Sequence, residues 1–323
     1  MLPKPLYEAL PYGYVLVGVL TITGIEPIFG KVCGIALIAI GIFIYQTRMR
    51  YRHRKQQIVA YGGIRHPGVK RTDSHGEPIS RGRSPAQQDF YRGEDSYAKG
   101  DYAGARQWYR QAAEQGSVSA QVNLGVMCVD GQGGPQDDQE AVYWYSRAAE
   151  QGDALAQFNL GAMYIEGHGV APNLDEAMRW YRQSADQGNA PAQFSLGVLY
   201  EQTPGTIHLQ EALQWYLKAA EQGYAPAQVN LGVLYAEGRG VRQNFQEALR
   251  WYQAAATGGY ASAQFNLGVM YLEGQPGIPQ DRAIAYVWFA RAAKQGDADA
   301  RQLQQELAMQ LTSDQKAQVA EML

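Results

Sequence analysis

The chain has 323 residues, with 28 Lys or Arg against 31 Asp or Glu, and a formal net charge of −3. This length accommodates about two ordinary domains. The two cysteines, Cys33 and Cys128, belong to no Cys-x-x-Cys motif or Cys/His cluster, which excludes the usual zinc-binding and thiol-redox classes. An intrachain disulfide is not expected, because Cys33 lies in an apolar stretch and Cys128 on a helical face.

Charge is distributed very unevenly along the chain. Residues 1–46 are apolar, residues 48–92 hold eleven Lys/Arg against three Asp/Glu, and residues 93–323 hold fifteen against twenty-six. The small net charge is therefore a near-cancellation between a basic and an acidic segment. We predict four parts: a membrane anchor at 1–47, a basic flexible linker at 48–85, a repeat domain at 86–297 and a cap at 298–323.

The apolar stretch from Tyr12 to Tyr45 is interrupted by Glu26-Pro27 and by Lys31. One continuous helix here would be about 50 Å long, against about 30 Å for the hydrocarbon core of a bilayer. A charged residue and a proline at its centre would be costly. We therefore expect a transmembrane helical hairpin with spans at about 10–25 and 28–46. A single span at 28–46 and a segment that does not span the membrane are the alternatives.

Five cations follow the apolar stretch at once, namely Arg48, Arg50, Arg52, Arg54 and Lys55, whereas only Lys4 precedes it. This order disfavours a cleaved signal peptide. By the positive-inside rule the cations stay in the cytoplasm, so the repeat domain is expected on the cytoplasmic side of a bacterial inner membrane. The same cations either belong to a solvated linker or contact anionic lipid.

All six tryptophans recur at steps of 36, 36, 35, 36 and 37 residues: Trp108, Trp144, Trp180, Trp215, Trp251 and Trp288. Each is followed by Tyr or Phe. Leu-Gly pairs keep the same period from the second unit on: Leu124-Gly125, Leu160-Gly161, Leu196-Gly197, Leu231-Gly232 and Leu267-Gly268. A fixed period of this length is typical of a solenoid or propeller.

The spacing inside each unit is helical. Ala156, Leu160 and Tyr164 lie four residues apart, and Trp180 and Ala185 continue a second stripe. Each unit is therefore predicted to be two helices that bury their apolar faces only by stacking on neighbours. A Gln-Gly pair ends most second helices. The glycine of the Leu-Gly pair is expected to let two helices approach closely, and the Trp-Tyr pairs to pack in the core rather than bind ligand.

Residues 227–259 show the full motif, with Ala227, Leu231-Gly232, Tyr235, Gly238, Gly240-Val241, Ala248, Trp251-Tyr252 and Gly259. This pattern resembles the Sel-one-like repeat family, relatives of the tetratricopeptide repeats. The resemblance covers about two-thirds of the chain and implies an all-α, right-handed α-solenoid of six helix pairs that contacts other proteins. The first unit lacks Leu-Gly, residues 202–208 replace the Gly-x-Gly-Val turn of the fourth, and Thr312 marks a break in a two-helix cap.

One row of residues is a candidate partner-binding groove. It comprises the residue before each Leu-Gly pair, Asn123, Asn159, Ser195, Asn230 and Asn266, and the apolar residue before that, Val122, Phe158, Phe194, Val229 and Phe265. Amides offer both a donor and an acceptor to an extended peptide. If the helices pack as in tetratricopeptide repeats, the row lines a concave groove and is exposed in the free protein. The alternative is that the amides bond to neighbouring helices.

Enzyme chemistry is not predicted. The histidines lie in the linker or in inter-helix loops, and the run Gly131–Gly134 lacks the Lys-Ser/Thr of a phosphate-binding loop. We expect no catalytic, cofactor-binding or metal-binding residue and no nucleic-acid partner. The leading hypothesis is a membrane-anchored scaffold that recruits a protein, with a basic or extended segment favoured by the acidic repeats. A regulator of envelope stress or of exopolysaccharide export is an alternative, and a hydrolase is the less favoured third.

Overall fold

The computed structural model describes residues 84–202 and 205–323. The predicted membrane hairpin, nearly all of the basic linker and the five cations from Arg48 to Lys55 lie outside these residues. Within them, none of the helices combines the length and apolar character needed to cross a membrane.

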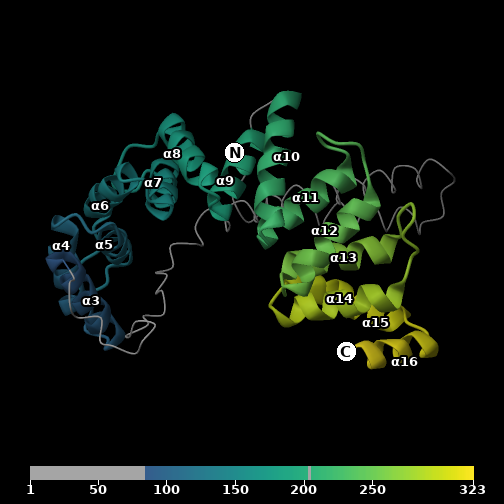
Figure 1. The fold of residues 1–323 in the computed structure, drawn as a ribbon. Helices are drawn as coiled ribbons and strands as arrows, with labels where there is room; N and C mark the ends of the chain where they lie inside the picture. Colours follow the sequence, from purple (N-terminus) through teal and green to yellow (C-terminus); the bar gives the residue numbers. More distant parts are fainter. Residues whose placement is uncertain (1–83, 203–204) are drawn as a thin grey trace, which may run out of the picture. The chain divides into compact units, whose positions relative to one another are not determined.

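The described residues form fourteen helices and no strand (Figure 1). Six pairs make the repeats, and we call the first helix of each pair helix A and the second helix B. The A helices are α3 (Pro85–Ala98), α5 (Val118–Asp130), α7 (Ala154–Glu166), α9 (Ala190–Gln202), α11 (Ala225–Glu237) and α13 (Ala261–Glu273). The B helices are α4 (Tyr102–Glu114), α6 (Asp138–Glu150), α8 (Leu174–Asp186), α10 (Thr206–Glu221), α12 (Phe245–Thr257) and α14 (Arg282–Lys294). Two further helices, α15 (Ala298–Gln310) and α16 (Ser313–Met322), follow.

Consecutive helices from α3 to α15 pack against one another, and α16 packs back onto α14. Stacking of this kind buries the apolar stripe that one helix pair alone would expose. The predicted all-α helical-repeat solenoid is therefore confirmed for the described residues.

Short polar side chains start most of the helices. Asp153 accepts a hydrogen bond from the backbone N–H of Ala156 at the start of α7, and Asn173 accepts one from Glu176 at the start of α8. Each B helix is followed within two residues by a glycine with a positive φ, between 82° and 94°, which an L side chain rarely adopts: Gly116, Gly152, Gly188, Gly223, Gly259 and Gly296. The predicted glycine stops are confirmed.

The departures from the repeat are local. In the fourth repeat α10 begins at Thr206 and has 16 residues, against 13 in the other B helices, so an extra N-terminal turn replaces the usual loop. In the sixth, Gln275 and Ile278 exchange backbone hydrogen bonds of 2.8 and 2.7 Å within a longer loop. Thr312 caps α16 through a capping box, which explains the break that the sequence shows there.

The tryptophans are core residues, as predicted. The four in the middle repeats are between 4% and 8% exposed, whereas those of the first and last repeats are half-buried: Trp144, Trp180, Trp215 and Trp251, then Trp108 and Trp288. Alanines with almost no exposed surface pack around them.

Candidate partner-binding face

The glycine of each Leu-Gly pair lets an aromatic ring of helix B lie directly against helix A. A Cβ atom on Gly161 would stand 2.7 Å from the Cδ1 atom of Tyr181, closer than carbon atoms tolerate. The expected close approach of the helices is therefore confirmed. The first repeat, which lacks the Leu-Gly pair, still has Gly93 in this place, where a Cβ would stand 2.6 Å from Tyr109. Sequence reasoning missed it because Arg92, not leucine, precedes the glycine.

The predicted polar row is less exposed than expected. Asn123 and Asn159 are buried, with 8% and 7% of their surface exposed, and Ser195, Asn230 and Asn266 are half-buried. The Nδ2 atom of Asn123 donates a hydrogen bond of 3.1 Å to Glu94 of the preceding A helix. This first member of the row thus makes the inter-helix bond that the alternative interpretation foresaw.

The apolar residues beside the row are core residues, so the expectation that they are exposed in the free protein is wrong. Their exposed fractions lie between 2% and 6%: Val122, Phe158, Phe194, Val229 and Phe265. The ring centroid of Phe158 lies 5.6 Å from that of Tyr181, and Phe194 lies at the same distance from Tyr216. The physical reason is the close contact at the Leu-Gly glycine, which draws the ring of helix B over this side of helix A.

The tyrosine after the tryptophan in each of the first four repeats marks a point that we call a junction. A junction consists of an acidic residue of helix A, the tyrosine of helix B in the same repeat, and the polar-row residue of the next helix A. At the first junction the Tyr109 hydroxyl donates to Glu94 over 2.5 Å. At the fourth the Tyr216 hydroxyl donates to Glu201 over 2.7 Å. Burial raises the pKa of the Tyr109 hydroxyl well above its ordinary value, and the adjacent Glu94 raises it further.

The acidic residues were missed in the sequence, although a signal was present. Four of them directly precede the loop glycine after helix A: Asp130, Glu166, Glu237 and Glu273. Several are paired within the chain. His168 Nδ1 lies 3.2 Å from Glu166, and Arg239 Nη1 lies 2.9 Å from Glu201 and 3.6 Å from Glu237. Helix A therefore carries one line of amide, small aliphatic and carboxylate side chains, which we call the A-helix row. In α11 these side chains are Asn230, Val233 and Glu237.

A glutamine relay inside the core was also missed. Gln157 donates from Nε2 to the backbone oxygen of Ala149 over 3.1 Å, and its Oε1 accepts from Gln187 over 2.8 Å. Four repeats have both bonds, centred on Gln121, Gln157, Gln193 and Gln264. In the fifth repeat Gln228 donates to Ala220, but Gly258 replaces the second glutamine. The relay satisfies buried polar groups that would otherwise destabilise the stack.

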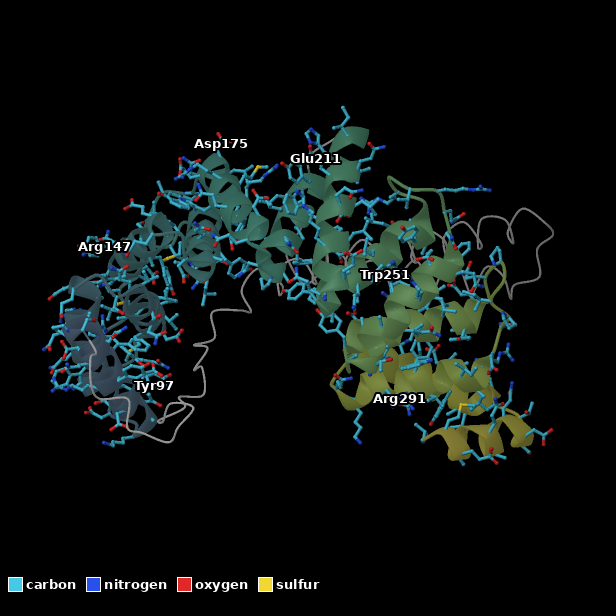
Figure 2. The ribbon with its side chains drawn as sticks, in the orientation of Figure 1. Tyr97, Arg147, Asp175, Glu211, Trp251 and Arg291 are labelled. Carbon is cyan, nitrogen blue, oxygen red and sulfur yellow. The ribbon has the colours of Figure 1, made fainter. Side chains whose placement is uncertain are left out.

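Cations lie over the tryptophan rings along the B helices. The guanidinium of Arg179 is 4.0 Å from the centre of Trp180, Arg250 is 4.7 Å from Trp251, and Lys218 is 4.1 Å from Trp215. Figure 2 marks Trp251 of α12 among the side chains. These contacts cover the outer faces of the rings. The result agrees with a packing role for the tryptophans and not with a free aromatic surface.

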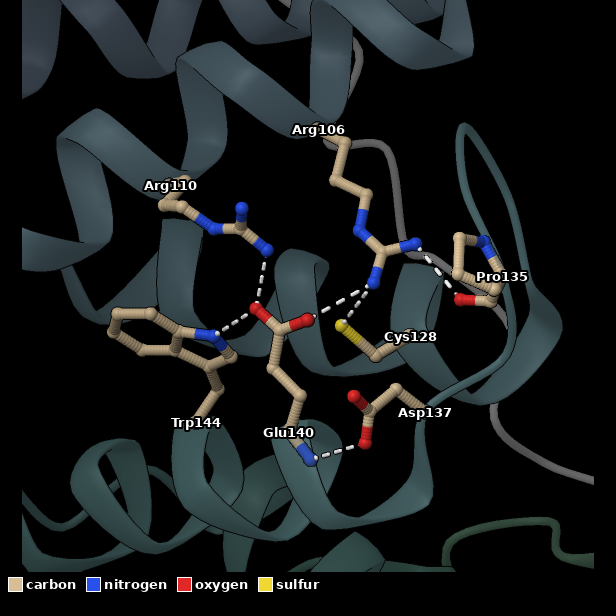
Figure 3. Close-up of polar contacts among 7 residues, drawn as sticks. All are labelled: Arg106, Arg110, Cys128, Pro135, Asp137, Glu140 and Trp144. Carbon is tan, nitrogen blue, oxygen red and sulfur yellow. Dashed lines mark hydrogen bonds and ion pairs between the residues drawn. The ribbon is translucent and has the colours of Figure 1, made fainter.

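A buried ion pair joins the first two repeats (Figure 3). Arg106 of α4 is 3.0 Å from Glu140 of α6, and it also donates to the sulfur of Cys128 over 3.3 Å and to the backbone oxygen of Pro135 over 3.0 Å. Although burial alone would raise the pKa of Glu140, hydrogen bonds from Trp144, Arg106 and neighbouring groups lower it to about 2. Burial raises the pKa of the Cys128 thiol to about 12, so this free thiol is unreactive at neutral pH.

No group of three or more His, Cys, Asp or Glu in the described part of the chain has metal-site geometry. Of the histidines, His168 pairs with Glu166, and His208 stacks on Tyr200 with ring centroids 6.1 Å apart. The polar side chains that were predicted to bind a partner thus also hold repeats together. Only part of their polar surface is exposed to solvent.

The fold and the row define an α-helical repeat protein whose units stack through a tyrosine-centred junction. The sequence profile of the Sel1 repeat matches six consecutive segments, 90–117, 118–153, 154–189, 190–224, 225–260 and 261–297. The chain belongs to the Sel1 repeat family, whose members generally act as protein-interaction scaffolds.

One solved structure supports this assignment, and two others show weaker likeness. A Sel1 repeat protein from Oxalobacter formigenes is 33% identical, with a TM-score of 0.61, and the match covers 67% of this chain and 86% of that one. The immunity protein Pa5087 from Pseudomonas aeruginosa is 25% identical over 66% of this chain and 83% of its own, with a TM-score of 0.42. The Escherichia coli protective antigen c5321 is 24% identical over 97% and 83%, with a TM-score of 0.35. No curated protein matched the sequence.

Proposed function

We propose that the chain is a non-catalytic scaffold that recruits a protein partner by docking an extended, basic segment along the A-helix row. The observation that supports this is the repetition of three side chains at i, i+3 and i+7 on helix A. In α11 they are Asn230, Val233 and Glu237. The amides and valines of this helix and α13 are half-buried and the carboxylates exposed, so each of these two repeats presents one donor–acceptor group, one small apolar contact and one carboxylate.

The spacing of the repeats suits a strand-like ligand. Stacked helices lie about 10 Å apart, and an extended chain advances about 3.3 Å per residue. Every third residue of the segment would therefore meet the same position of the next repeat. Negative charge at that position favours Lys or Arg in the partner and speeds association with a basic segment.

We further propose that residues 1–47 hold the scaffold at the bacterial inner membrane, with the repeats in the cytoplasm and the cations Arg48 to Lys55 near anionic lipid. The apolar stretch from Tyr12 to Tyr45 and the cations that follow it support this. Alkaline phosphatase and fluorescent-protein fusions after Leu323 test the topology. Fluorescence without phosphatase activity is expected, and an active phosphatase would contradict the proposal.

Binding is tested with the full-length protein and a fluorescent 15-residue peptide, (Lys-Gly-Ser)5, whose lysines recur about every 10 Å when extended. Fluorescence anisotropy should show binding, and the matching (Glu-Gly-Ser)5 peptide should not bind. The double variant Glu237→Gln/Glu273→Gln should weaken binding severalfold, since each charged contact contributes up to about 1 kcal/mol at an exposed site.

A matched control changes the same charge elsewhere. Glu150 and Glu221 are exposed acidic residues at the ends of B helices. The double variant Glu150→Gln/Glu221→Gln should bind the lysine peptide almost as the wild type does. Equal losses in the two double variants would mean that only net charge attracts the peptide, and docking along the A-helix row would be refuted.

A further inference from the structure

The junction between the second and third repeats combines three polar groups: Asp130 at the end of α5, Tyr145 of α6 and Asn159 of α7. The Tyr145 ring is held against α5, because a Cβ on Gly125 would lie 2.5 Å from its Cε1 atom. Burial and the nearby charge of Asp130 raise the pKa of Tyr145 above the ordinary value, while contact with Asn159 opposes this. Asp130 and Asn159 therefore approach the same hydroxyl group from two successive A helices.

Two of these groups have bonding capacity that the described residues do not use. Asp130 is exposed, and no ion pair or hydrogen bond joins its carboxylate to any residue in 84–202 or 205–323. Asn159 is 7% exposed, and its Nδ2 atom has no acceptor among the described residues. A buried amide without an acceptor is costly, so a group that supplies one would be bound favourably.

Other junctions meet the same demands internally. At the first, Glu94 accepts both the Tyr109 hydroxyl, over 2.5 Å, and the Asn123 Nδ2, over 3.1 Å. Glu94 directly follows Gly93, and in the second repeat the residue that directly follows the glycine is Val126. No carboxylate therefore reaches Asn159 from this place.

The fourth junction shows how a cation completes such a site. Glu201 accepts the Tyr216 hydroxyl on one oxygen, over 2.7 Å, and the Arg239 guanidinium on the other, over 2.9 Å. Only 9% of the Glu201 side chain is exposed. Arg239 comes from the loop of the following repeat, so the chain itself supplies here the basic side chain that Asp130 lacks.

We infer that the junction of Asp130, Tyr145 and Asn159 is the docking point for one lysine or arginine residue of the partner. The side-chain cation pairs with Asp130, and the main-chain carbonyl oxygen of the same residue accepts a hydrogen bond from Asn159. This inference rests on the proposed function and specifies where on the A-helix row recognition is strongest.

One basic residue matches both unused groups. A carboxylate requires a cation, whereas an amide nitrogen requires an oxygen acceptor, and Lys or Arg in an extended segment carries both. The terminal torsion of an asparagine side chain is broad, so the amide can turn toward the surface while its Cβ stays in place. An acidic residue at this point would be repelled by Asp130.

The test uses the full-length protein and the (Lys-Gly-Ser)5 peptide in the anisotropy assay. Asp130→Asn removes the charge with almost no change in shape, and it should weaken binding about tenfold, as expected for a charged hydrogen bond. Asn159→Ala should weaken it about threefold. The control Glu150→Gln, with the same change of charge, should leave the affinity within a factor of two.

A second variant closes the junction as the first repeat does. Val126→Glu with Asp130→Ala reproduces the residues of α3, where Glu94 is followed four residues later by Ala98. It should bind the peptide no better than Asp130→Ala. Because Val126 is a core residue, 3% exposed, the new bond is measured as a coupling: in the Asp130→Ala background, the thermal midpoints of Val126→Glu, Asn159→Ala and their combination should give a favourable coupling, since the new carboxylate accepts the Asn159 amide. A coupling of zero would overturn the assignment of Asn159 as an unpaired donor.

The outcomes separate this inference from the proposed function. If Glu237→Gln/Glu273→Gln weakens binding and Asp130→Asn matches Glu150→Gln, the row binds the peptide but this junction is not its anchor, and the inference is overturned alone. If the wild-type protein binds neither peptide, both are overturned. A tenfold loss with Asp130→Asn, together with a favourable coupling between positions 126 and 159, supports the inference.

Discussion

Replacing Gly258 by glutamine is expected to stabilise the protein. In the fifth repeat Gly258 ends α12 with φ −72° and ψ 3°, and the glutamine that ends α10 has φ −79° and ψ 3°. The backbone is therefore already in the conformation that the relay glutamines adopt. The Oε1 atom of Gln228 accepts no hydrogen bond from the described residues, whereas the corresponding atom of Gln193 accepts one of 2.7 Å from Gln222.

Two gains and one cost set the size of the effect. The new buried hydrogen bond contributes about 1 kcal/mol, and loss of a glycine from the unfolded chain contributes about 0.4–1 kcal/mol. Ordering the glutamine side chain costs up to about 1.5 kcal/mol. The net gain is about 0.5 kcal/mol. For a repeat domain of this size such a gain raises the thermal midpoint by about 1–2 °C.

Thermal denaturation of the full-length protein, followed by circular dichroism at 222 nm, measures this shift. Gly258→Ala isolates the backbone contribution, and combining either change with Gln228→Ala completes a double-mutant cycle. The cycle should give a favourable coupling between positions 258 and 228. A coupling of zero would refute the reasoning, because the relay bond would then add nothing to stability.

Four other substitutions test the packing and the ion pair. Gly161→Ala should destabilise the fold by about 1–2 kcal/mol in denaturant melts, because the overlap with Tyr181 outweighs the helix propensity of alanine. Trp180→Ala should cost about 3–5 kcal/mol, and Trp108→Ala less, since Trp108 is only half-buried; equal losses would contradict the solenoid packing. Because the folded-state pKa of Glu140 is lowered from 4.5 to about 2, its contribution is complete above about pH 4.5 and is lost as pH falls toward 2, so Glu140→Gln should flatten the acid limb of a stability profile.

The period of the sequence was sufficient to predict the helix pairs, their order and most of their ends. Tryptophan and Leu-Gly recur in step, and both act locally, one by filling the core and the other by admitting an aromatic ring. The extra turn at the start of α10 was not predictable in the same way. There Thr206 and His208, which replace part of the loop, belong to the helix, and the ring of His208 stacks on Tyr200 of the preceding helix.

The site was predicted less well than the fold, for a physical reason. The sequence period was enough to identify the positions from Asn123 to Asn266. The exposure of a side chain, however, depends on which residues of other helices pack over it, and a sequence repeat does not show this packing. Phe158 is buried because Tyr181 packs over it. The acidic residue keeps the period in four repeats, from Asp130 to Glu273, but Glu94 and Glu201 stand at other positions, where each accepts the hydroxyl of the nearby tyrosine.

This variation between junctions has a consequence for register. In a solenoid with identical units, a bound strand could slide by one repeat, about three residues, with no change in energy, and several offsets would be populated together. Here Glu94 accepts the amide at one junction and Arg239 pairs with the carboxylate at another. At the junction of Asp130 neither group has such a partner among the described residues, so this contact is open to a ligand. Sliding a ligand by one unit therefore exchanges an open contact for a filled one. A chain built from near-copies of one motif thereby acquires a distinct start and a distinct direction along its length.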